Sequence, residues 1–186
     1  MGGIKMARIK SRWLLGVILL SLVGLVVLPV MARGPSRQAG KSNIGNLYLV
    51  TKDHTDPNWP VIPGPWGKMK YTLSGPEFAF VFNGHGLDPN TDYTLIYYPD
   101  KEGNPWPRED IICLGSDTAS ASGKVHIRNS VDTGDLPNPE TDINEGAKIW
   151  LVLSEAIDCD EEMMFGWSPD EYLFEYDLIT FDDTDE

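Results

Sequence analysis

Two cysteines, Cys113 and Cys159, offer the most definite chemistry in this chain. In an oxidising compartment a single pair of cysteines forms one disulfide. The competing chemistry is a metal thiolate, but a blue-copper site needs a histidine a few residues after the cysteine and then a methionine. Asp-Glu-Glu-Met-Met follows Cys159, and Leu-Gly-Ser follows Cys113. The sequence therefore predicts a disulfide between the two cysteines and no copper site.

Four tryptophans in turn-like contexts are the candidate ligand-binding residues. They are Trp59 (Asn-Trp-Pro), Trp66 (Pro-Trp-Gly), Trp106 (Pro-Trp-Pro) and Trp167 (Gly-Trp-Ser-Pro). Rigid aromatic rings on loops offer contact area to sugar faces or protein partners at a small cost in entropy. The other interpretation is that these rings cap the open ends of the fold by packing against the neighbouring prolines. The sequence leaves both interpretations open.

Acidic and amide side chains on either side of residues 136–141 form a candidate calcium site. They are Asp132, Asp135, Asp142, Asn144 and Glu145. Calcium prefers oxygen ligands of this kind, and it is the one cofactor that the sequence suggests. The pattern does not match an EF-hand loop, which needs further ligands and a glutamate at its end. The alternative is that these residues form solvated acidic loops without a bound ion.

No catalytic motif is found in the sequence. The histidines, His54, His85 and His126, are isolated and lack the spacing that places two imidazoles on one metal. The chain has no nucleophile elbow, P-loop or dinucleotide-binding fingerprint. Carboxylates are abundant, and a glycosidase needs two of them across a cleft. We therefore predict a non-catalytic protein and keep an extracellular hydrolase as an alternative.

The first 32 residues have the pattern of a signal peptide or a signal anchor. Four basic residues precede an uncharged apolar run from residue 13 to residue 30, and the small residues Val-Met-Ala follow Pro29. This order matches a charged region, an apolar region and a signal peptidase site. The run also just reaches the length of a membrane helix, so cleavage and retention both stay open. Either way we expect an extracellular or cell-surface protein, in contact with a membrane only through residues 13–30 if these are retained.

The charge of the chain limits its partners. The formal net charge is −13, and residues 1–32 hold four basic and no acidic residues, so their removal would take the charge from −13 to −17. A surface this acidic repels phosphate backbones and anionic lipid headgroups. We therefore expect no nucleic-acid partner, and a glycan or a protein of the cell envelope instead.

Beyond residue 32 the sequence indicates a linker, one domain and a short tail. Residues 33–43 (RGPSRQAGKSN) lack apolar periodicity, as flexible linkers do. Residues 44–183 have the length of one ordinary domain, and residues 184–186 form an acidic tail.

Within the domain, apolar residues recur with a period of two. We expect strands near residues 46–52, 68–73, 77–82, 93–98, 111–114, 124–128, 147–154 and 172–181. Glycines and prolines separate these runs, and no run supports a long amphipathic helix. The sequence thus predicts an all-β fold, namely an antiparallel Greek-key β-sandwich of about 7–9 strands.

One local motif supports this fold. Residues 87–93 (LDPNTDY), followed by Thr-Leu-Ile-Tyr, resemble the L-x-P-x-T-x-Y tyrosine corner of fibronectin type III domains. The resemblance implies that the Tyr93 hydroxyl bonds back to the backbone of the preceding corner, with Leu87 as its apolar partner. The motif covers about 12 residues, and the chain continues for some 85 residues beyond it, where a fibronectin type III domain would soon end. It therefore indicates a Greek-key sandwich, not membership of that family.

A broader resemblance covers most of the domain. The segments WGKMKYTLSGPEFAFVFNGHGL, DYTLIYYPD, AKIWLVLS and EYLFEYDLITFDD resemble uncharacterised secreted domains of prokaryotes, archaea in particular. This resemblance implies a fold and a location but no activity. We expect a non-catalytic binding or structural module of the cell envelope, with two further alternatives: a carbohydrate-binding module that uses the loop tryptophans, and an envelope assembly subunit.

Overall fold

A computed structural model describes residues 42–103 and 106–185 of the chain. The predicted signal peptide or anchor at residues 1–32 and nearly all of the predicted linker lie outside the described residues. The described part consists of strands, turns and two 3-10 helices of three residues each. None of the described helices is long and apolar enough to cross a membrane.

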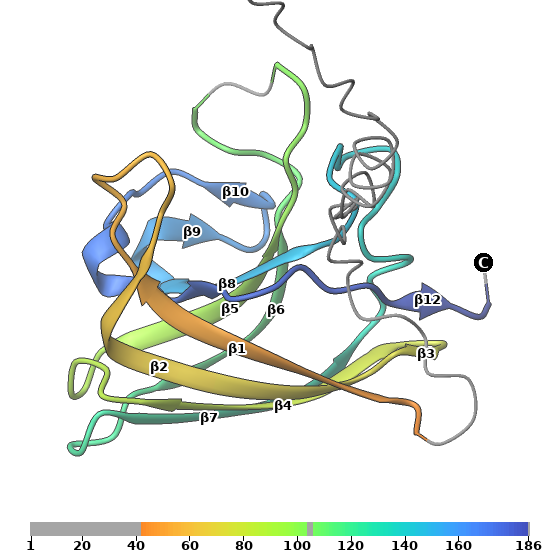
Figure 1. Ribbon diagram of the computed structural model, residues 1–186. Helices are drawn as coiled ribbons and strands as arrows, with labels where there is room; N and C mark the ends of the chain where they lie inside the picture. The colour runs from red at the N-terminus through yellow and green to blue at the C-terminus, as the bar shows by residue number, and fades with distance from the viewer. Residues whose placement is uncertain (1–41, 104–105, 186) are drawn as a thin grey trace, which may run out of the picture. The chain divides into compact units, whose positions relative to one another are not determined.

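The described residues form twelve strands (Figure 1). Seven have six residues or more: β1 (Ile44–Lys52), β2 (Val61–Thr72), β4 (Phe78–His85), β5 (Asp92–Tyr98), β6 (Ile112–Thr118), β7 (Lys124–Val131) and β8 (Lys148–Leu153). Five have two residues: β3 (Ser74–Gly75), β9 (Ile157–Asp158), β10 (Met163–Met164), β11 (Phe174–Glu175) and β12 (Asp182–Asp183). The 3-10 helices are η1 (Ser154–Ala156) and η2 (Pro169–Glu171).

Two antiparallel sheets face each other and enclose the core (Figure 1). The larger sheet has the strand order β11-β1-β2-β4-β7, and the smaller has the order β6-β5-β8. Strands β9 and β10 form a small antiparallel hairpin, and β12 pairs with β3 in parallel. The all-β, antiparallel sandwich predicted from the sequence is thus confirmed for the described residues.

The core lies between the two sheets because each sheet turns one apolar face inward. On β4, the side chains of Phe78, Phe80 and Phe82 are at most 3% exposed, whereas the alternate residues Ala79 and Val81 are half-buried. Burial of each phenylalanine contributes about 2 kcal/mol of hydrophobic stabilisation. The period of two that the sequence shows here is the period of an inward and an outward face.

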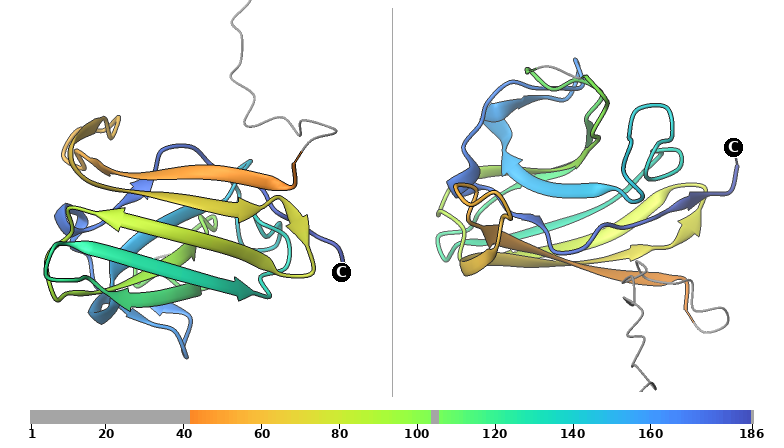
Figure 2. Two further views of the ribbon diagram at one scale, coloured as in Figure 1. Left: turned by 90° about the horizontal axis from the view of Figure 1, so that it is seen from below. Right: turned by 45° about the horizontal axis from the view of Figure 1, so that its top comes forward.

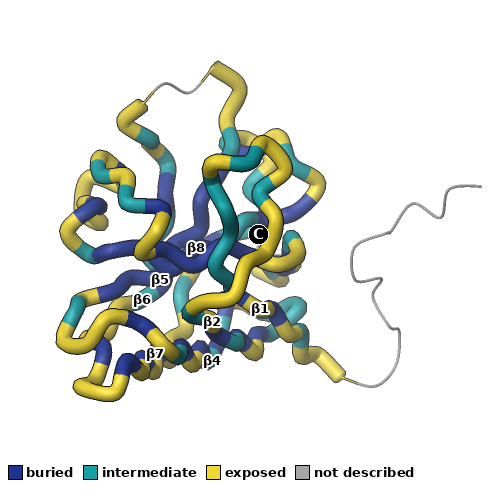
Figure 3. Tube along the Cα trace, turned by 60° about the vertical axis from the view of Figure 1, so that its left-hand side comes forward, coloured by how far each residue is buried: buried dark blue, intermediate teal, exposed yellow. Residues whose placement is uncertain are grey.

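Strands β5 and β8 are buried on both faces. All residues from 93 to 98 of β5 and from 149 to 153 of β8 are buried, whereas β1 and β7 contain several exposed residues (Figure 3). One face of β5 and β8 packs against the larger sheet. On the other face, Arg108 lies over the Tyr98 ring, and the rings of Trp167 and Phe174 contact Trp150. The domain therefore has a third layer of short and irregular segments over the smaller sheet, which the sequence does not predict.

The C-terminal segment joins the two sheets instead of forming the single strand expected at residues 172–181. Leu173 pairs with Leu151 of β8, and the next two residues, β11, pair with β1. Further along, Ile179 pairs with Ala147 and Phe181 pairs with Leu136. The segment changes partner every few residues because it runs between edge strands that belong to different sheets.

Strand β2 begins at Val61, well before the start at residue 68 that the sequence predicts. Its early part contains Pro63 and Pro65, which argue against a strand when only the sequence is considered. These two prolines precede the residues of β2 that pair with β4, so on that side they interrupt no ladder. Trp66 consequently lies on a strand and not in a turn.

Asn43 and Thr184, one residue outside each predicted boundary of the domain, form hydrogen bonds with β3. The side-chain amide of Asn43 donates to the carbonyl of Ser74 at 2.7 Å and accepts from its backbone N–H at 3.1 Å. At the other end, the backbone N–H of Thr184 donates to the carbonyl of Gly75 at 3.2 Å. The short strand β3 therefore holds both ends of the described domain.

The contact implied by the tyrosine-corner motif is present. The backbone N–H of Asp88 donates to the Tyr93 hydroxyl at 3.3 Å, and Leu87 is 4% exposed. The backbone N–H of Leu87 also donates to the carbonyl of Gly123, in the turn before β7, at 3.1 Å. The corner thus fixes the point where the chain crosses from β4 to the other sheet at β5.

The predicted disulfide between Cys113 and Cys159 is confirmed. It joins β6 to the turn of the β9–β10 hairpin, and its Cα atoms are 5.7 Å apart. It therefore ties the third layer to the smaller sheet.

Replacing both cysteines with alanine should lower the free energy of unfolding by about 4 kcal/mol, because the unfolded chain regains the loop-closure entropy between cross-linked residues. The two cysteines are 46 residues apart. Urea unfolding of the double variant and of the oxidised and reduced wild type measures the effect. The reduced wild type should match the variant, and a loss below about 1 kcal/mol would contradict the prediction.

Candidate functional site

A cavity of about 800 Å³ opens on the smaller sheet, on the face turned away from the larger sheet. Tyr98 pairs with Lys148 across β5 and β8, and Ile96 pairs with Trp150. Because residues two apart on a strand share a face, Tyr98, Lys148 and Trp150 project to the same side and form the floor. The cavity is lined by Lys52, Trp59, Tyr98, Asp100, Trp106, Arg108, Lys148, Trp150, Trp167, Phe174 and Glu175.

Aromatic rings make up most of this lining. On the floor, the rings of Tyr98 and Trp150 stack with their centroids 3.8 Å apart and an angle of 16° between planes. On the walls, the Trp167 centroid lies 6.1 Å from that of Trp59, 6.3 Å from that of Trp106 and 6.1 Å from that of Trp150. Trp106 is 48% exposed and Trp167 is 44% exposed. Two large indoles at one cavity are therefore left half in solvent.

The β9–β10 hairpin positions one wall. Met164 of β10 exchanges two backbone hydrogen bonds with Arg108, at 2.8 and 2.9 Å. Cys159, in the turn of the same hairpin, is bonded to Cys113 of β6. The hairpin thereby holds the segment that carries Trp106 and Arg108. The Arg108 guanidinium lies 5.5 Å from the centroid of the Tyr98 ring, within range of a cation–π contact.

The loop between β1 and β2 supplies the opposite wall. Its ends are joined by a hydrogen bond from the backbone N–H of Asp53 to the carbonyl of Pro60, at 2.9 Å. Trp59 has a φ of +48°, a left-handed conformation that is rare for a bulky residue. Its ring makes an edge contact with Phe174, 5.1 Å between centroids. Strained residues of this kind concentrate at functional sites.

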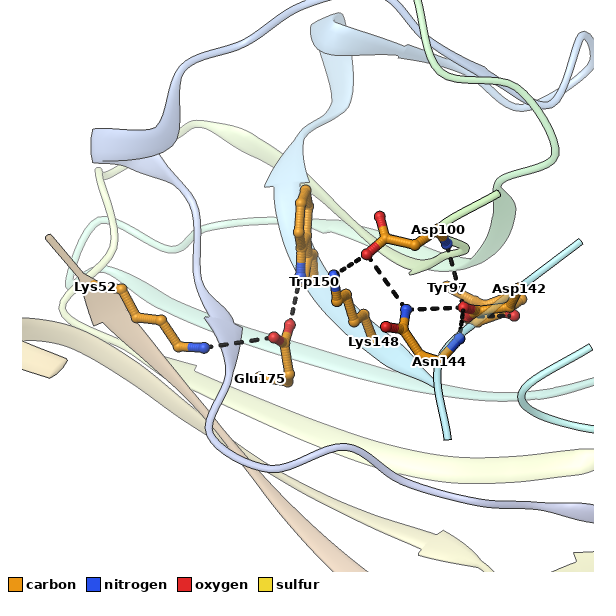
Figure 4. A network of polar contacts seen from close by, with 8 residues as sticks. All are labelled: Lys52, Tyr97, Asp100, Asp142, Asn144, Lys148, Trp150 and Glu175. Atoms are coloured by element: carbon orange, nitrogen blue, oxygen red, sulfur yellow. Dashed lines mark hydrogen bonds and ion pairs between the residues drawn. The ribbon is translucent and has the colours of Figure 1, made fainter. Parts of the chain in front are cut away.

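A buried carboxylate connects the floor to the junction of the sheets (Figure 4). Glu175 is 8% exposed, and its carboxylate accepts hydrogen bonds from the Trp150 indole N–H and from the Lys52 ammonium, the latter at 3.4 Å. These partners come from β8 and β1, which belong to different sheets. The pairing satisfies a charge that would otherwise be costly to bury.

A second carboxylate, that of Asp100, lines the cavity and is paired with the Lys148 ammonium. It accepts hydrogen bonds from the Lys148 ammonium and from the Asn144 amide, the latter at 3.3 Å (Figure 4). Burial alone would raise the pKa of Asp100, but the hydrogen bond and charge of Lys148 outweigh it and hold the pKa below its ordinary value. Asp100 is therefore ionised at neutral pH.

The structure brings three of the four candidate tryptophans to one cavity. Trp59, Trp106 and Trp167 come from three different loops and line the same space. Trp66 does not, since it projects from β2 on the outer face of the larger sheet, beside Tyr48 and His85.

Two of the candidate calcium ligands, Asp135 and Asp142, form hydrogen bonds within the domain. Among residues 42–103 and 106–185, no group of three or more His, Cys, Asp or Glu side chains is placed to hold a metal ion. Asp142 is 7% exposed, and its carboxylate accepts from the Tyr97 hydroxyl at 2.8 Å and from the backbone N–H of Asn144 at 2.9 Å. The carboxylate of Asp135 accepts from the backbone N–H of Asp183 at 2.8 Å. These two carboxylates hold loops in place, and neither Asp132 nor Glu145 lies with them in such a group.

Comparison of the chain with known protein families, with curated proteins and with solved structures gives no match. The resemblances drawn from the sequence segments stay predictions.

The charged residues of the cavity are not among the site residues predicted from the sequence. Two of them carried a signal: Lys148 and Glu175 are charged residues inside otherwise apolar runs, AKIWLVLS and YLFEY. A charge within a buried strand implies a partner or a lined cavity. Tyr98, Trp150 and Phe174 gave no such signal, because aromatic residues in strands are ordinary core residues.

Replacing Lys52 with methionine should lower the free energy of unfolding by about 3 kcal/mol, because the Glu175 carboxylate then stays buried without its cation. The double variant Lys52→Met/Glu175→Gln removes the charge as well and should recover most of the loss. Urea unfolding at pH 7 measures both.

The control is Lys101→Met. Lys101 forms an exposed ion pair with Asp110 at 3.1 Å, and its loss should cost less than about 1 kcal/mol. A double variant as unstable as Lys52→Met alone would contradict the role of the buried charge.

Proposed function

We propose that this chain is a non-catalytic, extracellular binding module whose cavity takes a saccharide of the cell envelope. The observation that carries the proposal is the convergence of Trp59, Trp106 and Trp167 from three loops on one cavity, with two of the rings half-exposed. Exposed indoles gathered at a concave site, unlike single exposed apolar residues, are typical of a ligand-binding surface.

The cavity offers both kinds of contact that a sugar needs. Its indole faces suit the apolar C–H faces of a pyranose ring. Its charged groups, Lys52, Lys148 and Arg108 beside Asp100 and Glu175, provide donors and acceptors for hydroxyl groups. The volume of about 800 Å³ lies in the range of ligand sites, 300–1,000 Å³.

The carboxylates of the cavity favour binding over hydrolysis. A glycosidase needs a carboxylic acid that is protonated at working pH. The lowered pKa of Asp100 disfavours that role. The Glu175 carboxylate already accepts hydrogen bonds from the Trp150 indole and the Lys52 ammonium, so it is engaged in holding the sheets.

The disulfide between Cys113 and Cys159 supports a location in an oxidising compartment, as the N-terminal sequence also suggests. A cell-envelope ligand is therefore the class to test first.

The purified full chain, kept in mild detergent, should bind at least one member of a panel of uncharged cell-envelope oligosaccharides saturably in calorimetric titrations. Trp106→Ala should weaken this binding at least tenfold, because the half-exposed ring, which makes an edge contact with Trp167, is available to contribute a face to the ligand. Trp167→Ala should have a larger effect.

The matched control is Trp66→Ala, which removes an equally exposed indole outside the cavity and should leave the affinity unchanged. Thermal melts establish that each variant is folded. A panel without any binder, or an equal loss in Trp66→Ala, would overturn the proposal.

A further inference from the structure

The outer face of the larger sheet collects positive charge on an acidic chain. All 28 acidic residues follow Lys52, and only eight lysines and arginines lie from Lys52 onward. Four of these eight project from this face: Lys68 and Lys70 of β2, and Lys124 and Arg128 of β7. The burial pattern assigns them to the outer side, since Met69, Val125 and Ile127 between them are buried.

No acidic residue occupies an outward position on β1, β2, β4 or β7. Where β2, β4 and β7 are paired, the outward positions from Trp66 onward are Trp66, Lys68 and Lys70 on β2, Val81, Asn83 and His85 on β4, and Lys124, His126 and Arg128 on β7. The Asp117 carboxylate of β6 reaches the margin of this face, where it accepts from the backbone N–H of His126 at 3.1 Å. Seen from below, no other described element covers these four strands (Figure 2).

The outward side chains of β2, β4 and β7 form a grid that includes the four cations. The register across β2, β4 and β7 gives three rows: Trp66–His85–Lys124, Lys68–Asn83–His126 and Lys70–Val81–Arg128. Rows lie about 6.7 Å apart along the strands, and β2 and β7 are about 10 Å apart across them. Each row contains at least one lysine or arginine. Cations that recur along the strands suit an extended polymer more than a compact ligand.

An aromatic shelf borders the grid. The Trp66 ring lies 4.8 Å from that of His85 and 6.5 Å from that of Tyr48, measured between centroids. The Lys68 ammonium lies 5.2 Å from the centroid of the Tyr48 ring. Tyr48 and Trp66 are 44% and 45% exposed. Flat rings beside fixed cations offer a sugar ring a stacking face and its acidic substituent an ion pair.

We propose that this face, here called the basic face, binds an anionic polysaccharide. The complementarity of charge is local: four cations without an outward acid between them, on a chain whose net charge is −13. A single-stranded nucleic acid shares the anionic backbone and the stacking rings. The disulfide favours the polysaccharide, because disulfides persist in compartments outside the cytosol, where acidic glycans are the common polyanions. The proposal stands independently of the ligand of the cavity.

The test measures binding of the full chain, in mild detergent, to polygalacturonate at 50 mM and 300 mM salt. Binding should weaken at least tenfold between these concentrations, as for other contacts between cations and a polyanion. Fully methyl-esterified polygalacturonate, which has the same backbone without the charges, should bind at least tenfold more weakly at 50 mM salt.

Charge-reversal variants locate the site. Lys70→Glu and Arg128→Glu should each weaken polygalacturonate binding at least fivefold. Lys101→Glu makes the same change in charge in a loop away from the basic face and should change the affinity less than twofold. Trp106→Ala, which alters the cavity alone, should leave polygalacturonate binding unchanged, so this proposal and that of the cavity fail separately.

Four results would overturn the proposal. They are equal binding of the esterified polymer, an equal loss in Lys101→Glu, tighter binding of poly(dT) that is lost in Lys70→Glu, and ligand-free self-association that is lost in Lys70→Glu. The third result would assign the basic face to nucleic acid, and the fourth would assign it to a second copy of the chain. Thermal melts of each variant confirm that the sheet is intact.

Discussion

The need to pair the buried Glu175 carboxylate is the physical constraint that links the two sheets to the cavity. Glu175 lies on the C-terminal segment, which pairs with β8 through Leu173 and with β1 through β11. A carboxylate at this depth requires donors, and it finds them in Trp150 of β8 and Lys52 of β1. The same contacts orient the indole on the cavity floor. One side chain, Glu175, thus contacts a strand of each sheet and orients a ring of the cavity floor.

The third layer lies over the smaller sheet and forms walls around the cavity floor. The disulfide fixes the turn of the β9–β10 hairpin to β6, and β10 fixes the segment with Trp106 and Arg108 through backbone pairing. Each wall is thus held by covalent or backbone contacts rather than by the aromatic side chains themselves. Of these side chains, Trp106 and Trp167 are left half-exposed. The outward face of the larger sheet needs no such covering layer, because its residues are mostly polar or basic. The cavity over the smaller sheet and the outward face of the larger sheet differ in chemistry, and we have proposed a separate ligand for each.

Local signals in the sequence predicted the elements better than the site. The alternation in residues 77–82 predicted the strand β4 and its period of two. The motif from Leu87 to Tyr93 predicted the hydrogen bond between the Tyr93 hydroxyl and the backbone of the corner. The cysteine pair gave the disulfide because no other cysteine competes. The predictions were wrong where strand pairing is non-local. Because of its two prolines, the early part of β2 was not predicted as a strand, and residues 172–181 pair with strands of both sheets instead of forming one strand. The spacing placed Asp135 and Asp142 in one candidate calcium site. In the structure, the Asp135 carboxylate accepts from the backbone N–H of Asp183, and the Asp142 carboxylate accepts from the Tyr97 hydroxyl. Trp59, Trp106 and Trp167 meet because the fold brings three separate loops together, which no local sequence pattern records.

The most direct test of the account is the indole N–H spectrum of the protein labelled with ¹⁵N in its tryptophans, recorded during titration with the envelope oligosaccharide that binds most tightly. The account predicts saturable shifts of the Trp59, Trp106 and Trp167 resonances with one common affinity, while the Trp66 resonance stays in place. Assignment follows from single Trp→Phe variants. Shifts confined to Trp66, or no saturable shift in the three cavity tryptophans, would contradict the claim that the cavity over the smaller sheet is the binding site.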